Sequence, residues 1–269
     1  MSLGRGVLYV ASATGLALLV RSIAFKPLPL WIALVAFGLY AAIVLGGVLA
    51  PQLEMYASVV WRGPHRSTSV ALTFDDGPHP EHTRRVLDVL DDYGVKACFF
   101  VLGSKAERHP EIVGEIVARG HEVGIHGYEH DRLLSLRSPK RIEAELARAL
   151  AVVEQATGKR PTMLRPPVGH VSPRTETAAS RLGLDIVAWS VRGRDGLAKA
   201  TASAVTARVV RGLRPGAIIL LHDAAEHDDR RPVAAEALPA ILRAAAGQGL
   251  SFALVSEYVE ARFGEAEEA

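Results

Sequence analysis

Two adjacent carboxylates close an apolar run near the first quarter of the chain. Residues 72–78 read LTFDDGP, so Asp75 and Asp76 stand between apolar residues and a Gly-Pro turn. A single aspartate could serve such a turn by hydrogen-bonding its own backbone. A second one beside it adds like-charge repulsion, which a nearby cation must offset. The pair therefore indicates either a solvated turn or a metal ligand next to a catalytic base.

Two histidines four residues apart offer further metal ligands. His126 and His130 lie in the stretch HGYEH, a spacing that lets both imidazoles converge on one side of a helical turn. With one aspartate they would leave a divalent ion with open positions for water and substrate. This donor mix suits one zinc ion, with cobalt or nickel as alternatives. His170, in a loop after Gly169, is a weaker candidate for substrate contact.

The elements that position these residues follow from residue 67 onward. Seven apolar runs are predicted strands: SVALTF, ACFFVLG, HEVGIH, TMLRPP, LDIVAWSV, AIILLHD and SFALV. Between them apolar residues recur at helical spacing, most clearly over residues 139–158, where Ile142, Leu146, Leu150 and Val153 share one face. This alternation predicts an α/β fold with a parallel sheet covered by helices, closed as a barrel or left open.

Polar residues gather at the C-terminal ends of the predicted strands. Arg165, Asp195, His222 and Asp223 occupy such ends, as do the aspartate pair and the first histidine. In parallel β/α folds chemistry takes place at this edge of the sheet. Polar residues placed at random would not fall repeatedly at the same edge of the sheet. The sequence therefore predicts a single site at the C-terminal ends of the strands.

Charge and cysteine content exclude several classes of protein. Lys and Arg total 31 against 29 Asp and Glu, a net charge of +2, which gives no reason to expect nucleic acid or a polyanionic partner. Cys98 is the only cysteine, so the chain has no internal disulfide. It lies in an apolar run, which favours a small buried side chain over a nucleophile.

The first fifty residues differ from the rest. Residues 30–50 are almost wholly apolar and would reach roughly 30 Å as a helix, the thickness of a bilayer core. Residues 6–20 form a shorter apolar run that continues to Phe25 past Arg21. No small-x-small cleavage site precedes a soluble segment, which argues against a signal peptide. Two transmembrane spans, one span and a buried soluble hairpin remain the alternatives.

These patterns predict four regions. Residues 1–50 would be a membrane anchor with one or two transmembrane helices, 51–66 a linker, 67–263 the catalytic domain and 264–269 an acidic tail. With two spans, Arg21 and Lys26 lie in or beside the only loop between them, which favours the cytoplasmic side for that loop. The N-terminus and the domain would then lie outside.

Five motifs in order resemble a known family. TFDDGPHPEHT, GIHGYEH, RPPVG, WSVRGRD and LLHD follow one another, and the sequence is similar over roughly residues 67–263 to the polysaccharide deacetylases of carbohydrate esterase family 4. The resemblance implies a distorted (β/α) barrel with about seven parallel strands. It also implies a hydrolase that removes N-acetyl groups from amino sugars with a divalent metal.

The resemblance assigns roles to the residues of the first half of the site. Asp75 corresponds to the general base, and Arg165 to the arginine that orients the base. Asp76, His126 and His130 correspond to the three metal ligands.

The remaining motifs supply the acid and the pocket wall. His222 corresponds to the general acid, tuned by Asp195. Leu220 stands where a leucine lines the pocket for the acetyl methyl, and the backbone N–H of Val168 stands where the family has an oxyanion donor.

The sequence departs from the family pattern at four positions. Gly127 stands where a Ser or Thr usually braces the second histidine, and Asp131 where Pro often follows it. Val168 replaces an aromatic residue and Gly196 the tryptophan that commonly walls the groove. No ligand, base or acid is lost, so these changes predict a more open sugar site.

Several functions are compatible with these observations. The first is an N-deacetylase of a cell-envelope glycan, tethered to a membrane with its domain outside. A deacetylase or deformylase of a lipid-linked sugar is an alternative, and a non-catalytic sugar-binding module is another. A non-haem iron oxygenase also uses two histidines and one carboxylate, but it needs no Asp-Asp pair and no Asp195–His222 couple.

Overall fold

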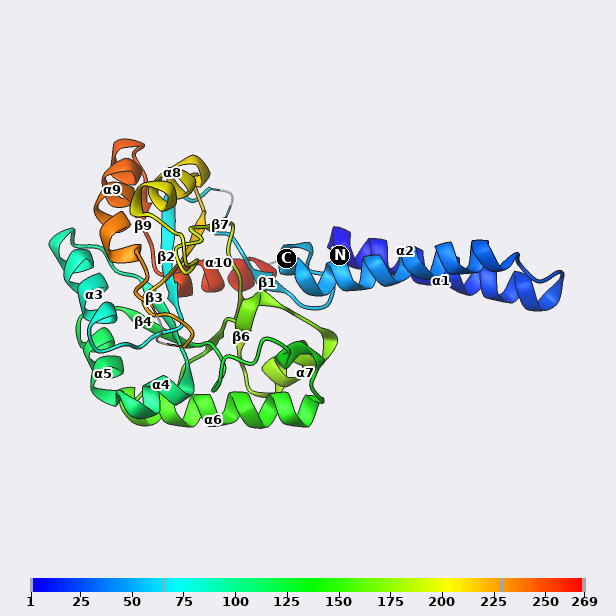
Figure 1. Ribbon diagram of the computed structural model, residues 1–269, viewed down its shortest axis with the longest axis horizontal. Helices are drawn as coiled ribbons and strands as arrows, with labels where there is room; N and C mark the ends of the chain where they lie inside the picture. Colours follow the sequence, from blue (N-terminus) through cyan, green and yellow to red (C-terminus); the bar gives the residue numbers. More distant parts are fainter. Residues whose placement is uncertain (1, 65, 228–229, 268–269) are drawn as a thin grey trace.

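The computed structural model describes residues 2–64, 66–227 and 230–267 and contains a helical hairpin joined to an α/β domain (Figure 1). The hairpin consists of α1 (Leu3–Ala24) and α2 (Leu30–Leu49), which project away from the domain and turn at their far end. Both helices are long and apolar enough to cross a membrane, and almost none of their surface is buried inside the molecule. Length and composition alone do not distinguish such spans from a signal sequence.

The domain is built on one parallel sheet. Its strands are β1 (Val59–Val60), β2 (Ser69–Asp75), β3 (Cys98–Val101), β4 (Glu122–Ile125), β5 (Met163–Leu164), β6 (Asp185–Val187), β7 (Val191–Arg192), β8 (Ile218–His222) and β9 (Ser251–Phe252). They are ordered β1-β6-β5-β4-β3-β2-β8-β7, and β9 pairs with β2. Every run predicted as a strand contains one. The described residues hold two more strands than predicted, because LDIVAWSV divides into β6 and β7 and because β1 forms upstream.

The division of LDIVAWSV explains the curvature of the sheet. Only residues 188–190 separate β6 from β7, yet these strands stand near opposite ends of the strand order. Ala188 N–H donates to the carbonyl of Val60 (2.9 Å), whereas Ser190 N–H donates to that of Ile218 (3.0 Å). Three residues can bridge the two ends only if the sheet curls. The structure therefore has the distorted, barrel-like form predicted from the sequence.

Helices cover the outside of the curled sheet, except that the last helix packs against its inner face (Figure 1). They are α3 (His82–Asp92), α4 (Gly103–Arg108), α5 (Pro110–Ala118), α6 (Pro139–Thr157), α7 (Pro173–Arg181), α8 (Ala202–Gly212), α9 (Ala234–Gly247) and α10 (Val255–Glu267), with 3₁₀ turns at Pro51–Leu53, Leu134–Leu136 and Pro167–Gly169. α6 begins at the cap Ser138, whose hydroxyl accepts from Arg141 N–H, and ends at the left-handed Gly158. Its predicted apolar face is buried.

Residues 51–66, expected as a linker, take part in the packing of the domain. β1 pairs with β6, and the side chains of Met55 and Ala57 are buried. The end of α2 is bonded to the domain as well: the carbonyl of Val48 accepts from Val171 N–H at 3.1 Å. The hairpin is thus docked against the domain by direct hydrogen bonds.

The interior and the C-terminus complete the fold. Cys98 is fully buried, and burial raises the pKa of its thiol, as expected for a packing residue. The region expected as an acidic tail, 264–269, continues helix α10 to Glu267. Residues 268–269 lie outside the described residues.

Candidate active site

Asp75 and Asp76 diverge at the end of β2. Asp75 is the last residue of the strand, and Asp76 has φ +73°, in the left-handed region that aspartate tolerates better than most residues. This change of backbone direction gives the two carboxylates different surroundings. Asp75 meets a guanidinium, and Asp76 meets two imidazoles.

A buried arginine holds Asp75. Arg165 is wholly inaccessible to solvent, and its Nη1 donates to Asp75 Oδ1 at 2.7 Å. Nη1 also lies 2.7 Å from Thr73 Oγ1, and Nη2 donates to the carbonyl of Ala188 at 3.0 Å. The guanidinium further covers the ring of Phe100, 4.2 Å from its centroid. These contacts fix the guanidinium, so Asp75 Oδ1 has one defined orientation.

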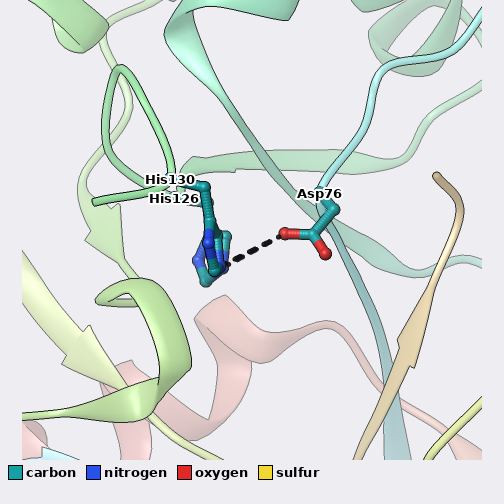
Figure 2. Close-up of side chains that lie close together, drawn as sticks. All are labelled: Asp76, His126 and His130. Atoms are coloured by element: carbon teal, nitrogen blue, oxygen red, sulfur yellow. Dashed lines mark ion pairs between the residues drawn. The ribbon is translucent and has the colours of Figure 1, made fainter. Parts of the chain in front are cut away.

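Asp76, His126 and His130 form a compact donor cluster (Figure 2). Oδ1 of Asp76 lies 3.6 Å from Nε2 of each histidine, and one ligand atom from each residue falls within 4.8 Å of the others. This Oδ1 is buried and has no hydrogen-bond partner among the described residues. A buried carboxylate oxygen without a partner is destabilising unless a cation binds it. The donors therefore fit a divalent metal ion.

His126 is oriented toward this cluster by its other nitrogen. Nδ1–H donates to the carbonyl of Arg165 at 2.6 Å, which leaves the Nε2 lone pair directed at Asp76. Burial lowers the pKa of His126, although the charges of Asp75 and Asp76 oppose the shift. A lowered pKa favours the neutral imidazole, the form that binds metal.

Glu226 braces His130 and was not identified from the sequence. Its Oε1 lies 3.0 Å from His130 Nδ1, and its carboxylate also pairs with Arg132, whose Nε is 3.2 Å away. This contact is an ion pair by distance only, because His130 Nδ1 has no hydrogen-bond partner among the described residues. Glu226 therefore lies beside His130 on the side where Gly127 offers no side chain. The only available signal was that missing brace, because Glu226 lies in a loop after β8. Asp131 pairs instead with Arg137 at 2.8 Å.

His222 and Asp195 form a second titratable pair. Nδ1 of His222 lies 3.0 Å from Asp195 Oδ1, and the His222 backbone N–H donates to Oδ2 at 2.7 Å. Burial by itself would lower the pKa of His222, but the charge and hydrogen bond of Asp195, together with Asp76 and Asp75, raise this pKa to about 9. This shift favours the protonated form of His222.

Asp223 lies behind the pocket. It is buried, Thr83 Oγ1–H donates to its Oδ2 at 2.5 Å, and burial raises its pKa to about 7. A Cβ at Gly77 would come within 2.1 Å of this Oδ2. Asp223 thus packs against the Gly77 turn that follows Asp76.

The sequence-predicted residues share one pocket of about 380 Å³. Its lining includes the two aspartates of β2, both histidines of the cluster, His222, Val168 and Leu220. Arg165 and Asp195 lie directly behind this lining, bonded to Asp75 and His222. Gly196 and Trp189 contribute to the wall, whereas His170 does not.

Comparisons with known sequences identify relatives of the chain. A family model described as polysaccharide deacetylase matches residues 62–187. A peptidoglycan-N-acetylglucosamine deacetylase of Bacillus cereus is 34% identical over 212 residues, which covers 78% of this chain and 97% of that protein. The deacetylase PgdA of Listeria monocytogenes is 36% identical over 70% of this chain, but only 38% of that longer protein is covered.

Solved structures share the fold. The Bc1960 peptidoglycan N-acetylglucosamine deacetylase superposes with a TM-score of 0.70 at 30% identity, over 77% of this chain and 95% of its own. An acetyl xylan esterase of Clostridium thermocellum, solved with a cobalt ion, superposes with a TM-score of 0.64 and is 34% identical. The match covers 70% of this chain and 89% of that structure. A pseudoenzyme of Bacillus anthracis superposes with a TM-score of 0.69 at 25% identity, over 78% of this chain and 72% of its own. Because a pseudoenzyme shares the fold, the fold alone does not establish activity. The chain belongs to the polysaccharide deacetylases of carbohydrate esterase family 4, metal-dependent hydrolases that act on amide bonds in glycans.

Proposed function

We propose that this protein removes N-acetyl groups from the amino sugars of a cell-wall glycan, using a divalent metal, at the outer face of a membrane. One observation carries the proposal: the donor cluster, the carboxylate held by Arg165 and the imidazole held by Asp195 all reach one pocket. The names of relatives that act on peptidoglycan or on chitooligosaccharides support the substrate class.

The proposed ligands are Asp76, His126 and His130, and the proposed ion is zinc, with cobalt or nickel as substitutes. A bound ion would lower the pKa of a water molecule and polarise the acyl oxygen of the substrate. Glu226 would keep the imidazole of His130 in its binding orientation.

Proton transfer is assigned to two groups on different elements. Asp75 would accept the proton of the attacking water, with Arg165 keeping the carboxylate in position. His222 would deliver a proton from Nε2 to the departing amine, because an amine anion cannot leave unassisted. Asp195 holds the opposite nitrogen of the ring and keeps the imidazole charged until that step.

Pocket residues would bind the acyl group itself. The backbone N–H of Val168 is proposed to stabilise the oxyanion, and Leu220 to pack against the acetyl methyl. Val168 has φ +53°, a conformation uncommon for a β-branched residue, and such strain is typical of functional loops. With Gly196 opposite, the site stays open enough for a branched or linked sugar.

A non-catalytic sugar-binding role is the main competing function. A binding module would tolerate loss of the base, the acid or a ligand, yet all are present here and in contact with their supporting residues. Release of acetate or formate from a panel of envelope glycans and lipid-linked sugars, with and without chelator, tests the proposal. Glycan binding without release, in protein with about one ion per chain, would contradict it.

A lipid-linked sugar is a second candidate substrate, and the docked hairpin favours it. Gln52, just beyond α2, donates from Nε2 to the carbonyl of Trp189 at 3.0 Å, and Trp189 lines the pocket. If α1 and α2 cross a membrane, the pocket is held close to its surface, where lipid-linked precursors also lie.

The orientation of the hairpin can be tested independently. Arg21 is in the last turn of α1 and Lys26 follows it, so the positive-inside rule places this end of the hairpin in the cytoplasm and the domain outside. Reporters active only in the cytoplasm, or only outside it, fused after Ala269, would distinguish the two orientations. A signal from the cytoplasmic reporter alone would overturn the outside placement and favour a precursor on the inner leaflet.

A further inference from the structure

Arginines concentrate on the wall of the active-site pocket. Arg132, Arg192, Arg194 and Arg230 all line it, although the chain as a whole is nearly neutral. Arg132 is neutralised by its ion pair with Glu226. The other acidic side chains of the lining are engaged as well, Asp75 with Arg165 and Asp76 in the donor cluster.

Two of these arginines pair with no acidic side chain among the described residues. Arg192 and Arg194 are exposed, and neither makes an ion pair or a side-chain hydrogen bond with any described residue. The one contact of the Arg192 guanidinium is with the ring of Trp189, 5.6 Å from its centroid. A guanidinium over an aromatic ring keeps its N–H groups available at the ring edge.

The backbone that carries both arginines is fixed. Arg192 ends β7, opposite Leu220 of β8, and the N–H of Gly193 donates to the Leu220 carbonyl at 2.9 Å. The Gly193 carbonyl accepts from Arg208 Nη1 at 2.6 Å. Packing is tight here, since a Cβ at Gly193 would lie 2.5 Å from Leu221 Cδ2. The two side chains therefore leave the sheet from defined positions.

Arg194 adopts a backbone conformation that its residue type disfavours. Its φ is +59°, in the left-handed region where glycine or asparagine is more stable. The next residue, Asp195, bonds His222 through both carboxylate oxygens. The strained residue thus directly precedes Asp195, which holds His222, the group assigned to protonate the leaving amine.

We propose that Arg192 and Arg194 form an anion-binding subsite on the wall of this pocket, which recognises a carboxylate or phosphate group close to the amino sugar that is deacetylated. The inference rests on the proposed deacetylase function and narrows its substrate class from neutral to anionic glycans. A guanidinium offers paired donors that match a carboxylate or a phosphate, whereas a neutral sugar hydroxyl gains little from its charge. A chain of N-acetylglucosamine alone carries no such group.

Matched substrates test the subsite. The first is a neutral N-acetylglucosamine oligosaccharide, the second the same oligosaccharide with a carboxylate ether on the neighbouring sugar, and the third its phosphate ester. The wild type should show a kcat/KM about tenfold higher for an anionic substrate than for the neutral one, the scale of one charge-assisted hydrogen bond. Preference for the second or third substrate distinguishes a carboxylate from a phosphate. Equal values for all three would overturn the proposal.

Variants locate the preference. The double variant Arg192→Gln, Arg194→Asn removes both charges, and Asn tolerates the left-handed backbone at position 194. This variant should lose the preference for anionic substrates, mainly because their KM rises. Its kcat/KM for the neutral substrate should change by less than about twofold. Arg211 is an exposed arginine at the end of α8, outside the pocket. The control variant Arg211→Gln should therefore keep the preference for anionic substrates. An unchanged preference in the double variant would refute the assignment.

Failure of this proposal is distinguishable from failure of the deacetylase function. Turnover of the neutral oligosaccharide by wild type tests the chemistry alone. If no substrate is turned over, calorimetric binding of the neutral and anionic oligosaccharides to wild type and the double variant still decides the subsite. The subsite is supported if wild type binds the anionic oligosaccharide more tightly than the neutral one, and if salt and the double variant both remove this difference. Equal affinities of wild type for the two oligosaccharides refute it.

Discussion

Asp75 Oδ2 lies 3.9 Å from Nε2 of His126, while Oδ1 of the same carboxylate is held 2.7 Å from Arg165. One oxygen is thus fixed by a buried cation, and the other borders the donor cluster. A water molecule held at the cluster would be within reach of that second oxygen. The separation of tasks between two consecutive aspartates follows from this geometry, because only Asp76 places an unpartnered oxygen between the histidines.

The donor cluster predicts that metal content and activity are lost together. Asp76→Ala and His126→Ala should each reduce bound metal from about one ion per chain to well below half, because each variant removes one of the three ligands that the described residues offer. Elemental analysis of the purified protein and acetate release measure the two effects. Asp131→Asn is the matched control, because Asp131 pairs with Arg137. This variant should keep both the metal content and the activity. Full activity in a metal-free sample would refute the mechanism.

Removing the charge of Asp75 should separate binding of metal from turnover. Asp75→Asn keeps the shape of the side chain but cannot accept a proton, so kcat should fall by roughly 10²–10⁴ while the metal content is retained. Single-turnover kinetics and elemental analysis on the same preparation give both values. Turnover within about twofold of wild type would exclude Asp75 as the base.

The pair Asp195–His222 predicts a pH dependence with a defined sign. His222 acts as an acid only when protonated, so activity should fall as the pH rises through its pKa, which Asp195 raises to about 9 against the effect of burial. Asp195→Asn removes the stabilising charge, so the alkaline limb of kcat/KM should move to lower pH. A limb that stays in place, or moves to higher pH, would show that Asp195 does not support the protonated ring.

Glu226 is predicted to act on metal affinity through His130. Glu226→Ala should weaken metal binding by about 10–100-fold, and Glu226→Gln should weaken it less, because glutamine keeps a side chain of the same shape beside His130. Competition with a chelator of known affinity measures the effect without any substrate. Glu129→Gln, an exposed neighbour of His130, is the control. Wild-type affinity in Glu226→Ala would mean that the contact is incidental.

The open wall predicts altered specificity when bulk is restored. A Cβ at Gly196 would lie 3.5 Å from Nδ1 of His222, an ordinary contact distance, and Gly196 lines the pocket, so Gly196→Trp adds bulk to this wall. This variant and Val168→Tyr should change the ratio of kcat/KM between short and long sugars. An identical ratio in all three proteins would place these positions outside the sugar-binding surface.

The strands and the metal donors could be predicted because their signals are local. Each apolar run that was predicted as a strand contains one, and His126 and His130 do meet. They meet across a bend that includes Gly127 at φ +88°, not on the helical turn that their spacing suggested. β1 and the division into β6 and β7 were not predicted, because their positions depend on pairing with distant strands: β1 pairs with β6, and β7 pairs with β8. The same applies to residues 51–66, whose packing depends on β6.

The sequence by itself determined which residue types are present and in what order they reach one rim of the sheet, because parallel strands bring their C-terminal ends together. Only the tertiary structure decided which side chains meet across it. Two of these contacts join segments far apart in the chain: Glu226 meets His130, and Val48 is bonded to Val171. Arg192 and Arg194, by contrast, reach the pocket without an acidic partner among the described residues. Such contacts depend on the closure of the curled sheet, which no local pattern encodes.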